Sequence, residues 1–174
     1  MGYRIPAFEL RPYMNVVELA KTRIMPLTGQ PYSFDMTPYF EEPCRFLDDV
    51  ASTCRVVISA PSQSGKSEIM LNFVAHVAIY DPAPSLLIMD TSNNSYKFSS
   101  GRVKPLLRDF VKLPAFEDTS ISNRNDDKKK AVSEYSLSNN SPLYIGGSVS
   151  LSDLCSKPCK YLVLDELARF YEGK

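Results

Sequence analysis

The chain has 174 residues, 44% of them hydrophobic, and its 20 basic and 20 acidic side chains give a formal net charge of zero. This length predicts one domain with enough apolar content for a core, and the neutral balance excludes a global basic field for nucleic acid, so any DNA contact must come from local patches. No apolar run approaches the ~18 residues that span a membrane, and the charged, proline-containing start is not typical of a secretory signal, so we expect a cytoplasmic protein without a membrane partner.

The first part of the chain predicts little regular structure. Residues 1–36 are expected to form an arm with one helix, over Val16–Ile24, with Asn15 as its N-cap. A second helix is predicted over Tyr39–Val50, because a proline suits its first turn and two glutamates favour its N-terminus. Tyr39 or Phe40, the two aromatic residues at the start of this helix, is a candidate for packing on a nucleobase, and ordinary core packing is the alternative.

Ala60–Ser67, with the sequence Ala-Pro-Ser-Gln-Ser-Gly-Lys-Ser, has the composition of a phosphate-binding loop. The β-branched run Arg55–Ser59 predicts a buried strand ahead of it, and Glu68–Tyr80 predicts a helix behind it. The first amides of such a helix lack partners and lie at the positive end of the helix dipole, so they attract phosphate. The first glycine of the general pattern is replaced by alanine, which the loop tolerates if that residue keeps a negative φ. The alternative is a chance strand–turn–helix.

The loop supplies the predicted nucleotide-binding residues, which are Ser62, Gln63, Ser64, Gly65, Lys66 and Ser67. Lys66 is expected to contact the β- and γ-phosphates of ATP and to act in catalysis. The hydroxyl of Ser67 is expected to bind Mg²⁺.

A second motif, Tyr161–Glu166, consists of four apolar residues that run into two acids. It is typical of a central parallel strand that delivers carboxylates at its C-terminal end. Asp165 is predicted to hold the Mg²⁺ shell through water, and Glu166 to act as the general base that orients the attacking water. A strand with an acidic turn is the alternative, but the two motifs in this order favour ATP hydrolysis, and the second acid favours an ATPase over a small-molecule kinase.

Between the two motifs the chain alternates between strand and helix patterns, which indicates a parallel α/β sheet. Ser85–Asp90 predicts a buried strand, and a helix is expected from about Ser95, restarted at Pro105 and ending before Pro114. The helix carries a basic stripe, for which a solvated face is favoured over a DNA-backbone contact. The stripe consists of Lys104, Arg108 and Lys112.

The remaining segments before the second motif predict a loop, a hairpin and a short helix. Residues 118–130 are polar and predict a mobile loop, whose lysines are weak candidates for DNA phosphates. Val132–Leu137 and Leu143–Ile145 flank a turn of asparagines and serine, which indicates a β-hairpin. A short helix is expected around Leu151–Cys155.

The cysteines and the single histidine are not expected to carry chemistry. Cys155 and Cys159 have the wrong spacing for a zinc knuckle, and reduced, partly buried thiols are favoured over a metal site or disulfides. His76 lies in the middle of a predicted helix, where a core or surface position is favoured over catalysis.

Several stretches, taken in order, resemble the ATPase part of the large terminase subunit of tailed bacteriophages, in the lambda GpA-like branch. They are Thr37-Pro38-Tyr39, Gln63–Glu68, Phe98–Pro105, Leu143–Ser148 and Leu162–Glu166. Because they extend from near the N-terminus almost to the last residue, the resemblance covers most of the chain.

The resemblance implies a P-loop NTPase fold of the ASCE type over residues 37–174, with a parallel sheet flanked by helices. It implies a motor that docks on the portal of a procapsid, uses ATP and Mg²⁺, and pumps double-stranded DNA. The implied partners are a terminase small subunit and, when the protein is complete, further copies of the same chain, in the cytoplasm of the host.

The roles implied for single residues follow the motifs. Gln63, Gly65, Lys66 and Ser67 carry over as nucleotide-binding positions, Asp165 as the metal-shell acid and Glu166 as the catalytic acid. Some family members have an arginine directly before the glutamine of the loop, where this chain has Ser62. An arginine finger is therefore expected from elsewhere, with Arg102 and a neighbouring subunit as candidates.

Such terminases continue beyond the two acids with a coupling motif and a nuclease domain, whereas this sequence stops at Lys174. We therefore expect an ATPase domain that is incomplete at the C-terminus. In the family's sheet the coupling strand lies between the P-loop strand and the acid-bearing strand, so its absence would leave a gap. We expect the isolated chain to bind nucleotide poorly, to hydrolyse it slowly and to be marginally folded unless a second polypeptide completes it. The alternative is that the two strands pair directly and close a smaller domain.

Two other functions are left open by the sequence. One is a helicase-like, nucleic-acid-dependent ATPase, which single-stranded DNA would stimulate. The other is a catalytically inactive terminase fragment that serves as a nucleotide-binding or assembly module.

Overall fold

A four-stranded sheet forms the centre of the computed structural model, which describes residues 12–48, 55–112, 134–150, 155 and 157–170. The strand order is β2-β3-β1-β4. The strands are β1 (Ser85–Met89), β2 (Glu134–Ser136), β3 (Pro142–Gly147) and β4 (Tyr161–Leu164). β1 pairs in parallel with both β3 and β4, while β2 and β3 form the predicted antiparallel hairpin. The predicted α/β fold with a mostly parallel sheet and flanking helices is confirmed.

Helix α3 (Lys66–Tyr80) is the packing centre of the molecule, and it begins at the lysine where the loop motif predicted a helix start. Its apolar residues contribute to all three buried clusters: Leu71 to the cluster on the sheet, Ile69 to the cluster with the N-terminal helices, and Phe73 to the cluster with β4. A helix that is packed on nearly every side needs apolar residues on nearly every side, which explains its sequence. The imidazole of His76 is buried as well, so of the two positions left open for it, core or surface, it takes the core position.

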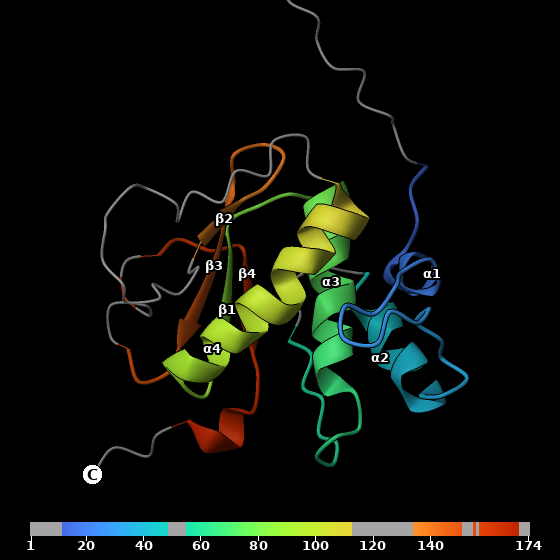
Figure 1. Ribbon diagram of the computed structural model, residues 1–174, viewed down its shortest axis with the longest axis horizontal. Coiled ribbons are helices and arrows are strands. Elements are labelled where there is room, and N and C mark those ends of the chain that lie inside the picture. Colours follow the sequence, from blue (N-terminus) through green and yellow to red (C-terminus); the bar gives the residue numbers. More distant parts are fainter. Residues whose placement is uncertain (1–11, 49–54, 113–133, 151–154, 156, 171–174) are drawn as a thin grey trace, which may run out of the picture.

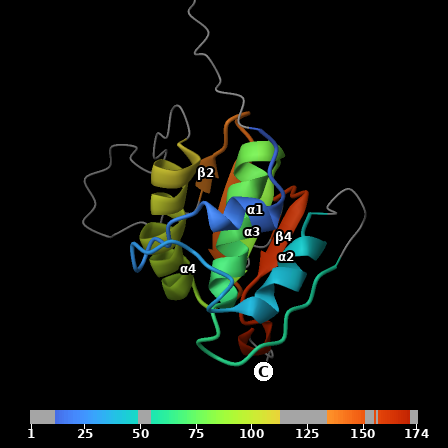
Figure 2. The same ribbon diagram turned by 90° about the vertical axis from the view of Figure 1, so that its right-hand side faces the viewer.

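Helices α1 (Val16–Lys21) and α2 (Glu41–Phe46) pack against α3, and α1 crosses it in Figure 2. Asn15 caps α1 as predicted, in a capping box with Glu18. The helix ends earlier than predicted, because the chain then turns into a short antiparallel bridge between Ile24 and Pro31. A 3₁₀ turn, Pro38–Phe40, precedes α2, which ends well before Val50.

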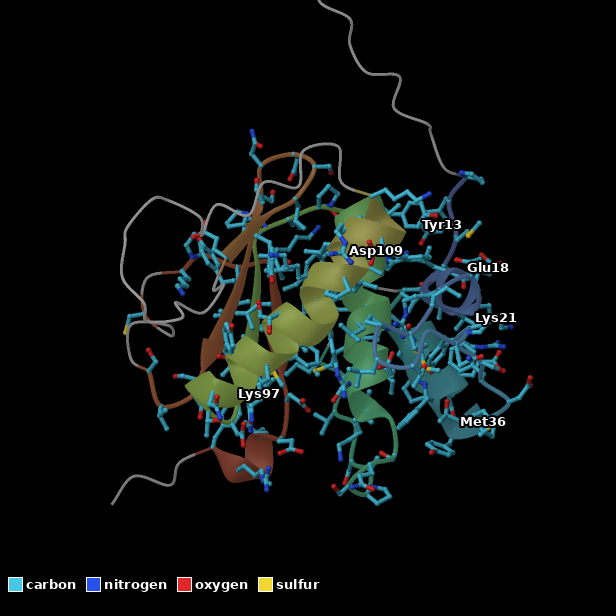
Figure 3. All side chains as sticks on the ribbon, in the orientation of Figure 1. Tyr13, Glu18, Lys21, Met36, Lys97 and Asp109 are labelled. Atoms are coloured by element: carbon cyan, nitrogen blue, oxygen red, sulfur yellow. The ribbon has the colours of Figure 1, made fainter. Side chains whose placement is uncertain are left out.

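The chain after β1 forms one long helical run over the same face of the sheet as α3 (Figures 1 and 2). It comprises α4 (Ser92–Phe98) and two π-helical segments, Ser99–Val103 and Leu106–Val111. Figure 3 shows Lys97 near one end of this run and Asp109 near the other. The run starts before the predicted Ser95, because the Thr91 side chain accepts a hydrogen bond from the amide of Asn94 and caps it. Arg108 pairs with its neighbour Asp109 at the surface, which fits the solvated face favoured for the basic stripe.

Gly147, at the end of β3, permits a close approach between the sheet and α4. A Cβ at this position would lie 2.4 Å from the backbone nitrogen of Ser92. The missing side chain therefore lets the first turn of α4 rest directly on the strand, which fixes the end of the sheet next to the candidate site.

The predicted strand over Arg55–Ser59 is wrong: residues 55–60 form no strand, and the Val57 side chain is 90% exposed. The prediction of a central acid-bearing strand also needs correction, since β4 pairs only with β1 among the described residues and is an edge strand there. Leu162 and Leu164, on the face opposite α3, are 56% and 42% exposed. A β-branched sequence forms a strand only where a neighbouring strand accepts its hydrogen bonds, and residues 55–60 have no such neighbour in the described sheet.

Some predicted features fall outside the described residues, namely the polar loop 118–130 and most of the helix around 151–155. Among the described cysteines, Cys44 is buried and Cys155 and Cys159 are exposed, and all three are free thiols. Burial raises the pKa of the Cys44 thiol to about 11, so it is an unreactive core residue. None of the helices in the described ranges combines the length and the apolar character that crossing a membrane requires.

Candidate functional site

The predicted phosphate-binding loop lies at the N-terminus of α3. Gln63 and Gly65 adopt positive φ angles of 60° and 95°, and Gly65 directly precedes the helix. Ala60 is not among the positive-φ residues, so the expected condition for replacing the first glycine is met. A Cβ at Gly65 would have room, with the Phe40 ring 3.6 Å away, but this φ would strain any residue other than glycine. The loop therefore turns tightly into the helix and presents its first amides at the helix start.

Lys66 folds back over the loop. Its Nζ donates hydrogen bonds to the carbonyl oxygens of Ala60, at 2.8 Å, and Pro61, at 2.9 Å. These carbonyls hold the ammonium group at the mouth of the loop. An anion bound there would offer it charged acceptors, which form stronger hydrogen bonds than neutral carbonyls.

Ser67 and Asp165 bring the two sequence motifs together although they are 98 residues apart. The Ser67 hydroxyl donates to Oδ2 of Asp165 over 3.5 Å. The amide of Asp165 donates to the carbonyl of Ile88 at 2.9 Å, which continues the pairing of β4 with β1 and fixes the carboxylate. Asp165 is 9% exposed, and burial, followed by the charge of Glu166, raises the pKa of its carboxyl. A second charge of the same sign makes ionisation costly, and a nearby cation would relieve that cost.

Glu166 points elsewhere. Its backbone is left-handed, with φ of 51°, and its Oε2 accepts a hydrogen bond from Nη1 of Arg169 at 2.8 Å. The same guanidinium nitrogen lies 3.6 Å from Oδ2 of Asp90, at the end of β1. The structure thus brings Lys66, Ser67 and Asp165 to one place, while the Glu166 carboxylate is bound to an exposed arginine.

The other predicted loop residues line its outer surface. Ser62 and Gln63 are exposed, and the carbonyl of Ser64 accepts a hydrogen bond from the Tyr39 hydroxyl at 3.2 Å. Of the two aromatic candidates for a nucleobase contact, Phe40 is only 2% exposed and belongs to the core, whereas Tyr39 is 57% exposed. Tyr39 lines a groove of about 390 Å³ that reaches the start of the loop at Ala60.

The donor set fits a magnesium ion bound together with phosphates. Ser67 and Asp165 offer a hydroxyl and a carboxylate oxygen, the hard ligands that Mg²⁺ takes when phosphates and water complete its shell. Within the described ranges, no three histidine, cysteine or acidic side chains gather in a way that would hold a metal ion by themselves. The site therefore suits a metal that arrives with a nucleotide.

Two arginine–carboxylate contacts near the loop were not predicted from the sequence. Arg23 is completely buried and binds Glu68, the residue after Ser67. On the other side of the loop, Arg169 holds Glu166. A glutamate directly after the lysine–serine pair was the available signal for the first contact, but nothing in the sequence marked Arg23 as its partner.

Comparison with known protein families identifies the family of the chain. The family model described as phage terminase large subunit gpA, ATPase domain, matches residues 28–174. No curated protein and no solved structure matched the chain. The match spans far more than half of the sequence and includes both motifs that meet at Ser67 and Asp165. The chain therefore belongs to the family of ATPase domains of the phage terminase large subunit gpA, as its motifs predicted.

Proposed function

We propose that the chain binds MgATP at Ser62–Ser67 and hydrolyses it to drive double-stranded DNA into a procapsid. Membership of a family of DNA-packaging ATPases supports this proposal. The observation that carries it is the approach of the Ser67 hydroxyl to Asp165 over 3.5 Å, because hydrolysis needs both motifs at one phosphate.

In the proposed mechanism the loop amides and Lys66 bind the phosphates. Lys66 exchanges the carbonyls of Ala60 and Pro61 for phosphate oxygens, which requires only rotation of its flexible side chain. Ser67 would hold Mg²⁺ with its hydroxyl and Asp165 through water, and the ion would supply positive charge to the phosphate oxygens.

Glu166 is the proposed general base, and it must leave Arg169 to orient the attacking water. Both partners of this ion pair are substantially exposed, with side-chain exposures of 65% for Arg169 and 39% for Glu166. Exposed ion pairs contribute at most about 1 kcal/mol to stability, so little free energy is lost when Glu166 leaves Arg169.

The proposed partners are those of a packaging motor: double-stranded DNA, a terminase small subunit, the portal of the procapsid and further copies of the chain, in the host cytoplasm. Arg102 contacts Glu68 at 3.5 Å. Because that contact engages the one candidate arginine of this chain, a neighbouring subunit is favoured as the source of an arginine finger.

Nucleotide binding is tested by titrating the 174-residue chain with a fluorescent ATP analogue in the presence of Mg²⁺. Lys66→Ala is expected to weaken binding at least about tenfold, since it removes the charged phosphate contact. Lys97→Ala is the matched control, because this exposed lysine lies on α4 (Figure 3) and its loss should leave affinity unchanged. Equal affinity of the Lys66→Ala variant and the parent chain would overturn the proposal.

Hydrolysis is tested by phosphate release from ATP. Glu166→Gln is expected to keep nucleotide binding and to lower turnover by roughly 10²–10⁴-fold, the usual contribution of a general base. Stimulation by duplex DNA supports the packaging function, whereas stimulation by single-stranded DNA alone would favour a helicase-like ATPase. Binding without any turnover would favour the inactive-module alternative.

A further inference from the structure

The Glu68 side chain is a junction between three separate parts of the chain. Its Oε2 accepts a hydrogen bond from Nη2 of Arg23 at 2.6 Å, and its Oε1 lies 3.5 Å from Nη1 of Arg102. Arg23 belongs to the segment after α1, and Arg102 to the helical run after β1. Glu68 itself stands in the first turn of α3, next to Ser67.

Arg23 holds its side of this junction rigidly. Its side chain is fully buried, its Nε donates to Oδ1 of Asn72 at 2.7 Å, and its guanidinium lies over the ring of Tyr32, 5.2 Å from the centroid. Asn72 lies one turn after Glu68 on α3, so the Arg23 guanidinium forms hydrogen bonds with two successive turns of the same helix. The backbone of Arg23 is fixed too, because its carbonyl accepts a hydrogen bond from the amide of Tyr32 at 2.8 Å.

Arg102 holds the other side more loosely. Its side chain is 28% exposed, and its guanidinium also lies 5.8 Å from the ring centroid of Phe98. The Glu68 side chain is only 14% exposed, and its carboxylate faces two positive charges that compensate its own charge. Such a carboxylate has one favourable orientation, and the helical turn that carries it is held with it.

We propose that Glu68 is a positioning residue of the nucleotide site. Because Arg23 and Arg102 both bind its carboxylate, Glu68 fixes the first turn of α3, from which Lys66 and Ser67 project. Through this contact, two other parts of the chain support the phosphate loop. One is the segment around Arg23, which precedes the family-matched residues, and the other is the helical run after β1 that carries Arg102. The proposal rests on the proposed function only for what this turn binds.

The test is hydrogen–deuterium exchange of the 174-residue chain without nucleotide, read by mass spectrometry for peptides that cover 62–70. In Glu68→Gln these peptides are expected to exchange at least about threefold faster, because Glu68 gives one oxygen to each guanidinium whereas glutamine keeps a single, uncharged acceptor oxygen. Arg108→Gln is the matched control, since it breaks an exposed arginine–carboxylate pair on the same helical run as Arg102.

Arg102→Gln decides the question if Glu68→Gln proves too unstable to fold. It removes a partly exposed partner and leaves the buried pair intact, so exchange is expected to rise in 62–70 but not in the peptides of β1 and β3. Arg102→Lys should restore part of the protection, since the positive charge is kept. Unchanged exchange in 62–70 would overturn the proposal, because the contact would then not hold this turn. An equal increase in β1 and β3 would overturn it too, by assigning Glu68 a general structural role.

This readout is separate from the proposed function. If Lys66→Ala leaves nucleotide affinity unchanged, nucleotide binding at the loop is refuted while the exchange data still decide the role of Glu68. If Lys66→Ala abolishes binding and exchange in 62–70 is unaffected by Glu68→Gln and Arg102→Gln, only the positioning role is refuted.

Discussion

The phosphate loop has an arginine–carboxylate pair on each of its two flanks, and the two pairs differ in kind. On the flank toward the N-terminal helices, Arg23 is 0% exposed and meets Glu68 at 2.6 Å. On the flank toward the sheet, Arg169 is 65% exposed and meets Glu166 at 2.8 Å. The nitrogen–oxygen distances of the two pairs are similar, but only the Arg169–Glu166 pair is largely exposed to water.

The difference separates the parts of the site that folding fixes from those that remain adjustable. A buried charge pair has no water to replace a lost partner, so its geometry is maintained as long as the core is intact. An exposed pair exchanges readily with solvent. Glu68, the proposed positioning residue, belongs to the first kind, and Glu166, the proposed general base, belongs to the second.

The largest expected effect concerns the buried flank. Arg23→Gln should lower the free energy of unfolding by about 3–5 kcal/mol, because it leaves the Glu68 carboxylate buried without its closest partner. Urea unfolding followed by circular dichroism measures the loss, with Arg108→Gln as the exposed control. If Arg23→Gln lowered the free energy of unfolding by less than about 1 kcal/mol, the buried pair would contribute no more than an exposed surface pair.

A second prediction uses the pKa of Asp165, which is raised in the folded state, first by burial and then by the charge of Glu166. A raised pKa means that the folded state holds the proton more firmly than the unfolded state, so stability falls as the pH rises through the folded pKa. Asp165→Asn removes this loss, and it should therefore be more stable than the parent chain at pH 7, with a gain that shrinks toward pH 4.

Asp109→Asn provides the control of opposite sign for this pH dependence. A hydrogen bond from Arg108 lowers the pKa of Asp109, so its ionised form stabilises the folded state at neutral pH. The asparagine variant should lose stability at pH 7 relative to pH 4. If both variants shift in the same direction in urea titrations at the two pH values, burial is not what sets the behaviour of Asp165.

The smallest expected effect concerns the exposed flank. Arg169→Gln should change the free energy of unfolding by no more than about 0.5 kcal/mol, because water replaces the guanidinium at Glu166. The measurement is the same urea titration as for Arg23→Gln, so the two arginines are compared under one condition. A cost comparable to that of Arg23→Gln would remove the distinction between the flanks.

The elements that the sequence predicted well are those with strong local signals. Asn15 caps α1, α3 begins at Lys66, and β2 and β3 form the hairpin that the turn residues indicated. Capping, glycine conformations and turn residues act within a few residues of each other, so they can be read without knowing the fold. The two site motifs belong to this class, because each is a short run with its own backbone geometry.

The strand over Arg55–Ser59 shows where local signals fail. Its β-branched residues fit a strand, yet strand formation depends on a partner that lies far away in the sequence. The position of β4 at the edge of the described sheet is decided in the same way, by pairing with β1 rather than by its own four apolar residues.

By itself, the sequence determined the loop at Gly65 and Lys66, the acids that follow β4 and the family to which they belong. Only the tertiary structure decided that Ser67 faces Asp165, that Arg23 is buried against Glu68 and that Glu166 turns to Arg169. Backbone preferences depend on residues that are close in the sequence, so the sequence alone predicts them. A charge pair across 45 residues is selected only when packing has removed water from both partners.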